Sequence, residues 1–315
     1  MRIVVTGGTG LIGRPLVTGL AEDGHEAFVL SRKPGEVKDL PPAVHVEGWN
    51  GRSSEGWGRL VDGADAVVNL AGETIAGEGL QGILLNRWDT DRKRRILDSR
   101  IQAGKAVTGA IGAARRKPAV LIQASAVGYY GPLGDEEKTE ETPAGVDFLA
   151  MTCVAWEASS KAVEDMGVRR AIVRTGLVLS GTGGVLPVMA LPFRLLAGGR
   201  LGSGRQWVPW IHLADEVRAI RFLLDNRGAA GPFNLVAPRP VTNAELSRLL
   251  GSALSRPSFL RVPAFPLRLV LGKKATLVLD GQRLSPKRLM DLGFRFRFPD
   301  AETALRDLLV SGSQG

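Results

Sequence analysis

The stretch RIVVTGGTGLIG at residues 2–13 decides the fold class, because an apolar run passes directly into a glycine-rich turn and then into a helical pattern. In such a unit the first glycine, Gly7, makes the tight turn. The second, Gly10, lets a pyrophosphate approach the backbone, and the third, Gly13, lets the helix lie close to the sheet. Free N–H groups at the helix start then face the phosphates. The segment predicts a dinucleotide site, against the alternative of an ordinary glycine-rich turn.

Apolar runs alternate with helical patterns through the first 180 residues, which predicts a parallel sheet with helices on both faces. The expected strands are 2–6, 26–31, 44–48, 65–70, 119–124 and 170–175. The expected helices are 11–23, 88–115, 148–166, 186–197, 213–226, 243–254, 264–272 and 300–310. Residues 50–63 are expected to form a short polar connection and 72–87 a glycine-rich loop.

The end of the second expected strand indicates which dinucleotide binds. Many NAD sites place an acidic residue there, whereas this chain has Ser31, Arg32 and Lys33. Positive charge and hydrogen-bond donors suit a 2′-phosphate, so the residues favour NADP over NAD. The alternative is that Arg32 and Lys33 are solvated at the start of a loop.

The fold class that follows is α/β: a Rossmann-like, doubly wound parallel sheet with a smaller, interleaved C-terminal α/β lobe. Residues 1–180 are expected to form the NADP-binding domain, with part of the later chain returning to it. Residues 181–315 are expected to form a substrate-binding lobe and a C-terminal extension.

Composition narrows the class of protein. The chain has 315 residues, of which 44% are hydrophobic, and no run long enough to span a bilayer, so we expect a cytoplasmic globular protein without a membrane partner. Cys153 is the one cysteine and the three histidines are scattered, so we expect neither a disulfide nor a metal site. The net charge of +9 includes an RKRR run at 92–95 without aromatic residues between the charges, and we expect no nucleic-acid partner.

Further motifs carry a resemblance to a known superfamily. They are DAVVNLAG at 65–72, Ser125 at the end of the fifth expected strand, RTG at 174–176 and WIHLAD at 210–215. With the glycine turn, they make nearly the whole chain similar to the extended short-chain dehydrogenase/reductases, which include nucleotide-sugar epimerases and dehydratases.

A smaller group within that superfamily is more similar still. The motifs that carry this likeness are NLAGE at 69–73, SAVGYYG at 125–131, ALPFRLLAGGRLGSGRQ at 190–206, PWIH at 209–212 and GQRLSPKRL at 281–289. They resemble the "epimerase family protein" group, whose members have a C-terminal extension of unknown function.

The resemblance implies a set of cofactor contacts, which extends those that the residues themselves indicate. The full set is Gly7, Thr9, Gly10, Leu11, Ile12, Gly13, Ser31, Arg32, Lys33, Leu70, Ala71, Gly72, Glu73, Arg95, Ser99, Arg100, Ser125 and Val178. On the helix 88–115, Arg95, Ser99 and Arg100 are expected to share roughly one side that faces the cofactor. Arg92, Lys93 and Arg94 are expected to meet mostly solvent.

The superfamily's catalytic pair is missing. Its members use a tyrosine whose phenolate is stabilised by a lysine four residues later. Neither Tyr129 nor Tyr130 has that lysine, and the two positions on the helix 148–166 hold Cys153 and Glu157. Because Glu157 would raise the thiol pKa, we expect Cys153 to stay protonated and to be neither acid nor nucleophile.

Three residues remain as candidate catalytic groups: Ser125, Tyr130 and Glu157. Tyr130 could act as an acid, although the sequence shows no cation to activate it; alternatively its ring packs at the cofactor or the lobe interface. Glu157 could act as a base, although the i,i+4 spacing favours an ion pair with Lys161. His212 is expected to cap the following helix.

The second lobe supplies candidate substrate contacts. Typical sugar epimerases clamp the substrate diphosphate with an arginine four residues before the histidine, and that position is Val208 here. With Tyr130, we therefore expect Arg205, Trp207 and Trp210 to form an aromatic and cationic wall. Alternatively, both tryptophans seal the lobe interface.

These observations support three hypotheses about function. The leading one is an NADP-dependent oxidoreductase or epimerase-like enzyme that acts on an unidentified small molecule between the lobes. The second is a catalytically weak or inactive protein that binds NADP(H) as a structural element or redox signal. The third is a nucleotide-sugar epimerase or dehydratase, which rests on fold analogy.

Overall fold

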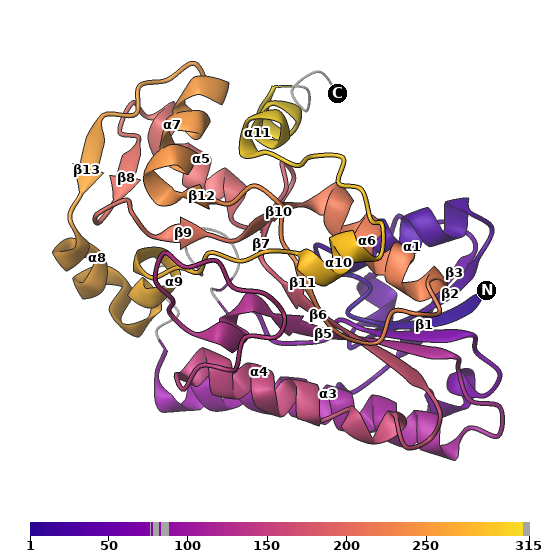
Figure 1. Cartoon of the computed structure of the whole chain (residues 1–315). Coiled ribbons are helices and arrows are strands. Elements are labelled where there is room, and N and C mark those ends of the chain that lie inside the picture. Colours follow the sequence, from indigo (N-terminus) through magenta and orange to yellow (C-terminus); the bar gives the residue numbers. More distant parts are fainter. Residues whose placement is uncertain (76, 78–81, 83–87, 311–315) are drawn as a thin grey trace.

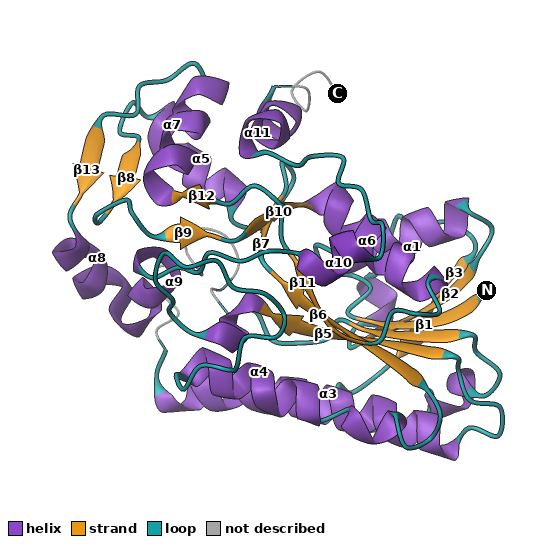
Figure 2. Cartoon of the chain, in the orientation of Figure 1, coloured by secondary structure: helices purple, strands orange, loops and turns teal. Residues whose placement is uncertain are grey.

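A parallel sheet organises the computed structural model, which describes residues 1–75, 77, 82 and 88–310. Among these residues, seven strands pair in the order β11-β6-β5-β4-β1-β2-β3 (Figures 1 and 2). They are β1 (Arg2–Thr6), β2 (Glu26–Ser31), β3 (Val44–Gly48), β4 (Ala66–Asn69), β5 (Val120–Ala126), β6 (Arg169–Thr175) and β11 (Gly231–Leu235). The order reverses between β1 and β4, so the loops after these two strands frame a crevice at the carboxyl edge of the sheet.

Helices cover both faces of the sheet. Figure 1 shows α1 (Gly13–Glu22) and α6 (Leu213–Asp225) on one face, and α3 (Thr90–Ala113) and α4 (Phe148–Ala158) along the other. Alternate residues of β1 serve the two cores: Ile3 and Val5 pack with α1 and α6, and Val4 packs with α3. Burial on both faces explains why β1, β4 and β5 read as nearly continuous apolar runs.

The second lobe is built from short strands and helices around its own core. Its strands are β7 (Leu177–Leu179), β8 (Gly199–Leu201), β9 (Trp207–Val208), β10 (Trp210–His212), β12 (Val241–Thr242) and β13 (Leu260–Val262). Its helices are α5 (Leu186–Arg194), α7 (Asn243–Ala253), α8 (Ala264–Leu271), α9 (Thr276–Leu279) and α11 (Ala301–Leu309). Phe193, Trp210, Leu246 and Leu305 are buried together at the centre of this lobe.

The C-terminal extension returns to the first lobe before it ends in the second. Lys138 N donates to Arg283 O at 2.9 Å, and Ser285 N donates back to Lys138 O at 2.9 Å. Helix α10 (Lys287–Asp291) then places Leu289 in the core of the parallel sheet. The chain therefore passes between the two lobes more than once, and no single boundary in the sequence divides them.

Single turns of 3-10 helix join several of these elements. They are η1 (Pro34–Glu36), η2 (Gly58–Val61), η3 (Val127–Tyr130), η4 (Lys161–Val163) and η5 (Gly272–Ala275). Of the expected loop at 72–87, most residues lie outside those described.

Three elements differ from the expectation. The segment 50–63 is no plain polar connection, because Trp57 is fully buried and η2 packs on the sheet. The helix expected over 148–166 ends at Ala158, where Ser159 turns against Gly104 of α3 and its Oγ bonds Trp156 O at 2.6 Å. Strand β11 lies beyond the six expected strands, because it follows a long excursion into the second lobe.

Candidate functional site

The glycines of the turn after β1 serve two purposes: two are required by the fold, and one leaves room for a ligand. A Cβ on Gly13 would lie 2.2 Å from Gly7 O, and Gly7 has φ +70° with Leu70 C 2.8 Å from its own Cβ position. The fold itself therefore requires glycine at both positions. At Gly10 the nearest described atom, Gly7 O, would lie 3.4 Å from a Cβ, and φ is not positive. The space beside Gly10 fits the close approach of a pyrophosphate.

A row of polar side chains joins the strand ends behind this turn. Thr6 Oγ1 donates to Asn69 Oδ1 at 2.6 Å, and Asn69 Nδ2 donates to Gln123 Oε1 at 2.9 Å. Ala71 N donates to Thr6 Oγ1 at 3.2 Å. The row holds Leu70 and Ala71 against the glycine turn, as expected of two loops that frame one crevice.

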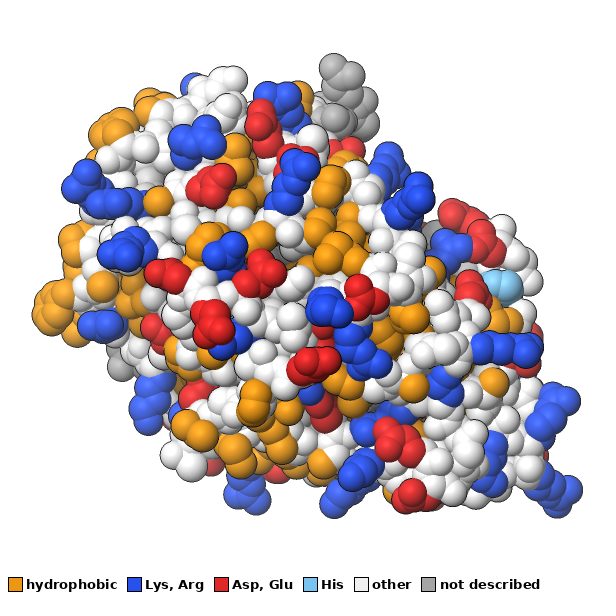
Figure 3. Space-filling model, viewed as in Figure 1, with side chains coloured by type: hydrophobic (Ala, Val, Ile, Leu, Met, Phe, Trp, Pro, Cys, Tyr) orange, Lys and Arg blue, Asp and Glu red, His pale blue; other side chains and the backbone are white. Residues whose placement is uncertain are grey.

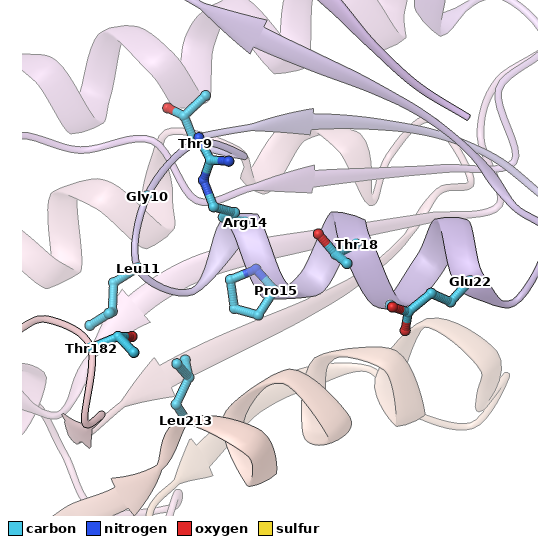
Figure 4. A pocket seen from close by; sticks show the side chains of 10 residues that line it. Thr9, Gly10, Leu11, Arg14, Pro15, Thr18, Glu22, Thr182 and Leu213 are labelled. Atoms are coloured by element: carbon cyan, nitrogen blue, oxygen red, sulfur yellow. The ribbon is translucent and has the colours of Figure 1, made fainter. Parts of the chain in front are cut away.

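A pocket of about 570 Å³ adjoins the turn (Figure 4). Its lining includes three of the predicted cofactor contacts, Thr9, Gly10 and Leu11, together with Thr182 from the segment after β7 and Leu213 at the start of α6. Arg14, Pro15, Thr18, Gly19 and Glu22 of α1 complete it.

Leu11 joins the pocket to the loop after β7. A Cβ on Gly184 would lie 2.9 Å from Leu11 Cδ2 and 3.8 Å from Val178 O. The structure therefore brings the predicted contacts Leu11 and Val178 into one neighbourhood.

The residues after β2 differ in their availability to a phosphate. Arg32 is exposed, and its side chain makes no hydrogen bond or ion pair with the described part of the chain. Lys33 Nζ instead pairs with Glu36 at 2.9 Å, and Ser31 Oγ accepts from Lys33 N at 3.1 Å. Arg32 is thus the side chain best able to meet a 2′-phosphate.

One face of α3 meets the segment after β4. Arg100 is buried, stacks 4.8 Å from the ring centroid of Trp156, and donates to Glu73 O at 3.0 Å. Ser99 Oγ accepts from Glu73 N at 3.1 Å. Burial lowers the pKa of Arg100 to about 10, so the guanidinium stays charged at neutral pH. A Cβ on Gly72 would lie 3.2 Å from its Cζ.

The two other arginines named on α3, Arg95 and Arg92, differ in burial. Arg95, expected near the cofactor with Arg100, is exposed. The prediction that Arg92 meets mostly solvent is wrong. The residue is only 8% exposed, pairs with the Glu73 carboxylate and donates to Thr74 O at 2.5 Å. The first turn of α3 packs against residues 73–75, where Arg92 pairs with the partly buried carboxylate of Glu73.

The position of the superfamily lysine holds a buried ion pair. Arg174 Nε and Nη2 bond the two oxygens of Glu157 at 2.9 and 3.0 Å, and Ser125 Oγ donates to Glu157 Oε1 at 2.7 Å. Burial disfavours charge on Arg174, but the bonds to Glu157 outweigh it and raise the pKa of Arg174. The expected pair of Glu157 with Lys161 is wrong, because α4 ends at Ala158 and Arg174 offers a bidentate partner inside the core.

Tyr130 lies at the other side of Arg174. Its hydroxyl donates to Asn234 Oδ1 at 2.6 Å and accepts from Arg174 Nη1 at 3.0 Å, so the cation that the sequence did not reveal is present. The residue is 2% exposed and packs with Val236 and Leu284. Burial raises the pKa of Tyr130 to about 12, although Arg174 opposes the shift.

Cys153 is buried beside the same network. Burial, and then the charge of Glu157, raise the pKa of Cys153 to about 11. The thiol is therefore protonated at neutral pH, in the direction that the sequence predicted.

The candidate residues of the second lobe do not form one wall. Trp210 is 1% exposed and packs in the core of the lobe. Trp207 is half-buried, and its Nε1 donates to Asp135 Oδ1 at 2.9 Å, whereas Arg205 is exposed in the loop between β8 and β9. His212 Nδ1 accepts from Ala214 N at 3.0 Å, which confirms the helix cap.

Sequence reasoning missed two buried ionisable residues near the end of β6, Arg174 on the strand and Glu216 on α6. Arg174 was quoted only as part of a motif, yet a charge inside the apolar run of a central strand requires a buried partner. Glu216 on α6 is fully buried; Thr175 Oγ1 donates to its Oε1 at 2.7 Å. Burial raises the pKa of Glu216 to about 8, so the carboxyl is mostly protonated at neutral pH.

Comparisons with known proteins agree with this geometry. The model of the NAD-dependent epimerase/dehydratase family matches residues 3–236, and that of a domain of unknown function matches residues 262–308. The epimerase family protein SDR39U1 homolog, chloroplastic, of Arabidopsis thaliana is 41% identical over 98% of this chain and 87% of that protein.

Two solved structures are also similar. Human epimerase family protein SDR39U1, solved with NADPH, has a TM-score of 0.87 at 34% identity over 98% of this chain and 99% of that one. A nucleoside-diphosphate sugar epimerase from Corynebacterium glutamicum has a TM-score of 0.77 at 32% identity. The match covers 100% of this chain and 60% of that one. The glycine turn, the seven-stranded order of the described residues and these matches together show that the chain belongs to the NAD-dependent epimerase/dehydratase family and carries that group's C-terminal extension.

Proposed function

We propose that the chain binds NADP(H) and transfers hydride between it and an unidentified small molecule in the cleft between the lobes. The observation that carries the proposal is the glycine turn, in which Gly10 has room that the fold does not need, with Arg32 unpartnered in the described structure at the end of β2. The human relative solved with NADPH supports the choice of cofactor. The one buried cysteine fits a reducing compartment such as the cytoplasm.

The chain's own residues would divide the work of binding. The N–H groups at the start of α1 face the pyrophosphate and Arg32 meets the 2′-phosphate. Ser99 and Arg100 hold the segment after β4 in place. When bound, the nicotinamide supplies or accepts the hydride.

Proton transfer in this site cannot follow the superfamily's route. The Ser125 hydroxyl donates its hydrogen bond to Glu157, so its oxygen is left to accept a hydrogen bond from a ligand N–H or O–H. The raised pKa values of Tyr130 and Cys153 keep both protonated at neutral pH, so neither acts as a base, and the Tyr130 hydroxyl already donates to Asn234. A substrate that takes its proton from water fits this arrangement, and Ser125 then orients the ligand.

A second candidate is binding without turnover, in which NADP(H) serves as a structural element or redox signal. It is favoured by the finding that Ser125, Tyr130 and Glu157 are all bonded to neighbouring side chains in the structure. Incubation with a panel of carbonyl and enone compounds, followed by nicotinamide absorbance, separates the two candidates. Oxidation of NADPH supports the enzyme; tight binding with no oxidation across the panel supports the alternative.

The nucleotide-sugar reaction has weaker support. Val208 stands where sugar epimerases place the diphosphate clamp, and Arg205 is exposed in the loop that precedes it. The Corynebacterium structure named for that activity shares the fold but has a longer chain.

Cofactor titration tests the proposal directly. Wild type is expected to bind NADPH more tightly than NADH, and Arg32→Ala should lose roughly 1.5–3 kcal/mol of NADPH binding while NADH binding is unchanged. Arg115→Ala is the matched control, because this exposed arginine precedes β5 and so lies at the opposite edge of the sheet. Equal affinity of wild type for the two cofactors would refute the NADP assignment.

A further inference from the structure

One end of the second lobe exposes large apolar side chains in unusual density. On α8, Phe265 is 76% exposed and Leu269 is 71% exposed, and they stand one helical turn apart on the same side. No residue of α8 is buried, in the part of the chain that the structure describes. Leu195 and Phe259 add 70% and 68% exposure. Single exposed apolar residues are ordinary, but a group of this size marks an interaction site.

Backbone pairing brings these residues together from two distant parts of the chain. β13 pairs in parallel with β8, with Leu260 opposite Gly199, and Leu260 N donates to Gly198 O at 3.2 Å. The segment after α5, which holds Leu195 and Leu196, therefore lies beside Phe259, and α8 follows β13 directly. Figure 1 shows β8, β13 and α8 at one extremity of the molecule. We call Leu195, Leu196, Phe259, Phe265, Leu269 and Val270 the apolar tip.

The two segments that form the apolar tip carry only positive charge. Neither 166–214 nor 246–279 contains an aspartate or glutamate. Arg194, Arg256, Arg261, Arg268 and Lys273 are exposed in these segments, and none forms an ion pair with a described residue. Asp280 follows the second segment directly. Burial raises the pKa of Asp280, and the charge of Arg268 opposes that shift. Figure 3 shows hydrophobic and basic side chains mixed at this end of the molecule.

We propose that the apolar tip and its arginines dock the protein on an anionic lipid surface. Phe and Leu side chains that enter the boundary between headgroups and acyl chains, with Lys and Arg beside them at the phosphates, are the features of proteins that lie on membranes. This is attachment to a surface: in the described residues, no helix is both long and apolar enough to cross a bilayer. We expected no membrane partner from the composition of the chain. Composition, however, does not show where exposed side chains lie together on the surface.

A bilayer fits this surface better than the other occupants. A second copy would bring arginine-rich, carboxylate-free segments together, and like charges repel. A peptide that binds by strand addition or as a helix needs a long free strand edge or a groove. The tip is an outer end of the lobe in Figure 1, and β13 is three residues long. An extended anionic plane matches both the position and the charge.

Vesicle flotation of the full-length chain tests the proposal. The protein should float with vesicles of phosphatidylglycerol and phosphatidylcholine at low salt, should be released as salt rises, and should not bind pure phosphatidylcholine. Each cation near an anionic surface is worth about 1 kcal/mol, which is about five-fold in partitioning. Arg261→Glu with Arg268→Glu should therefore weaken binding by roughly twenty-five-fold or more.

Matched variants separate the tip from general stickiness. Phe265→Ser with Leu269→Ser should abolish flotation, whereas Val146→Ser with Met151→Ser, which removes exposed apolar side chains elsewhere, should not. Lys105→Glu with Arg115→Glu controls for net charge. Thermal unfolding checks that each variant is folded.

Three results would overturn the proposal. One is no binding to anionic vesicles. The second is binding that the tip variants leave unchanged. The third is a different occupant of the tip. This would be a concentration-dependent dimer, or stronger binding to polyglutamate than to vesicles, if the double variant Phe265→Ser with Leu269→Ser abolishes that dimer or that binding.

Discussion

Gly10 and Gly13 look equivalent in the sequence, yet the structure gives them different physical roles. Gly13 is needed by the fold, since a Cβ there would overlap Gly7 O at 2.2 Å. Gly10 meets the described chain at 3.4 Å, which is an ordinary contact distance or slightly tighter. If the second glycine serves a ligand, its replacement should affect binding and leave stability nearly unchanged.

A pair of alanine variants tests this distinction. Gly10→Ala should change the free energy of unfolding by less than about 1 kcal/mol, yet weaken NADPH binding at least ten-fold. Gly13→Ala should cost several times more stability, because backbone atoms must move. Gly109→Ala on α3 is the control, since its Cβ would meet nothing described within 4 Å. Unchanged NADPH affinity in a folded Gly10→Ala protein would contradict the role given to the turn.

At the scale of elements, α4 and β6 are joined by the ion pair that stands in place of the missing lysine. Glu157 and Arg174 are both buried, at 9% and 3% exposure. Such a pair need not add stability overall, but breaking it leaves one charge without its partner. The pair also fixes Ser125 at the end of β5, so a structural contact sets the shape of the candidate site.

Glu157→Gln is expected to lower the free energy of unfolding by about 3–5 kcal/mol, because Arg174 keeps its charge in the core. Glu302→Gln breaks an exposed i,i+4 pair with Arg306 and should cost about 0.5 kcal/mol or less. Urea denaturation of both variants measures the difference. A cost for Glu157→Gln no larger than that of the control would show that Arg174 finds another partner.

The elements that were predictable are those with local signals. β1, β2 and β3 have the bounds that the sequence indicated. β1 and most of β2 are buried on both faces, whereas β3 lies at the edge of the sheet and only its Val44 is buried. The buried ion pair was not predictable. Glu157 lies on α4 and Arg174 on β6, so they meet where a helix packs on the sheet, and no spacing within one element indicates the contact. Trp57 was misjudged because one buried ring in a polar segment leaves no periodic pattern.

At the scale of the whole molecule, segments from the C-terminal part complete the first lobe. Helix α6 covers one face of the sheet, β11 extends it, and α10 closes over β11. Glu216 lies in this shared core, where the folded chain holds a proton that the unfolded chain releases. Stability should therefore depend on pH through this carboxyl.

The sign follows from the raised pKa. Between about pH 4.5 and about pH 8 the folded state binds one more proton at Glu216 than the unfolded state, so the free energy of unfolding falls as pH rises. Glu216→Gln should remove this slope and gain a few kcal/mol at pH 8, at about 1.4 kcal/mol per unit of pKa shift, with little change below pH 4.5. Asp225→Asn, exposed on the same helix, is the control. Parallel stability curves for wild type and Glu216→Gln would contradict the buried neutral acid.

The most direct test of the account is a crystal structure of the complex with NADPH. The pyrophosphate is predicted to lie against the N–H groups that follow Gly10, with the 2′-phosphate within hydrogen-bond distance of Arg32. Arg100 should stand no more than one water layer from the cofactor, and neither Tyr130 nor Cys153 should donate to the nicotinamide. A complex in which the phosphates lie away from the glycine turn, or in which Tyr130 has turned out of its bond with Asn234 to reach the nicotinamide, would contradict it.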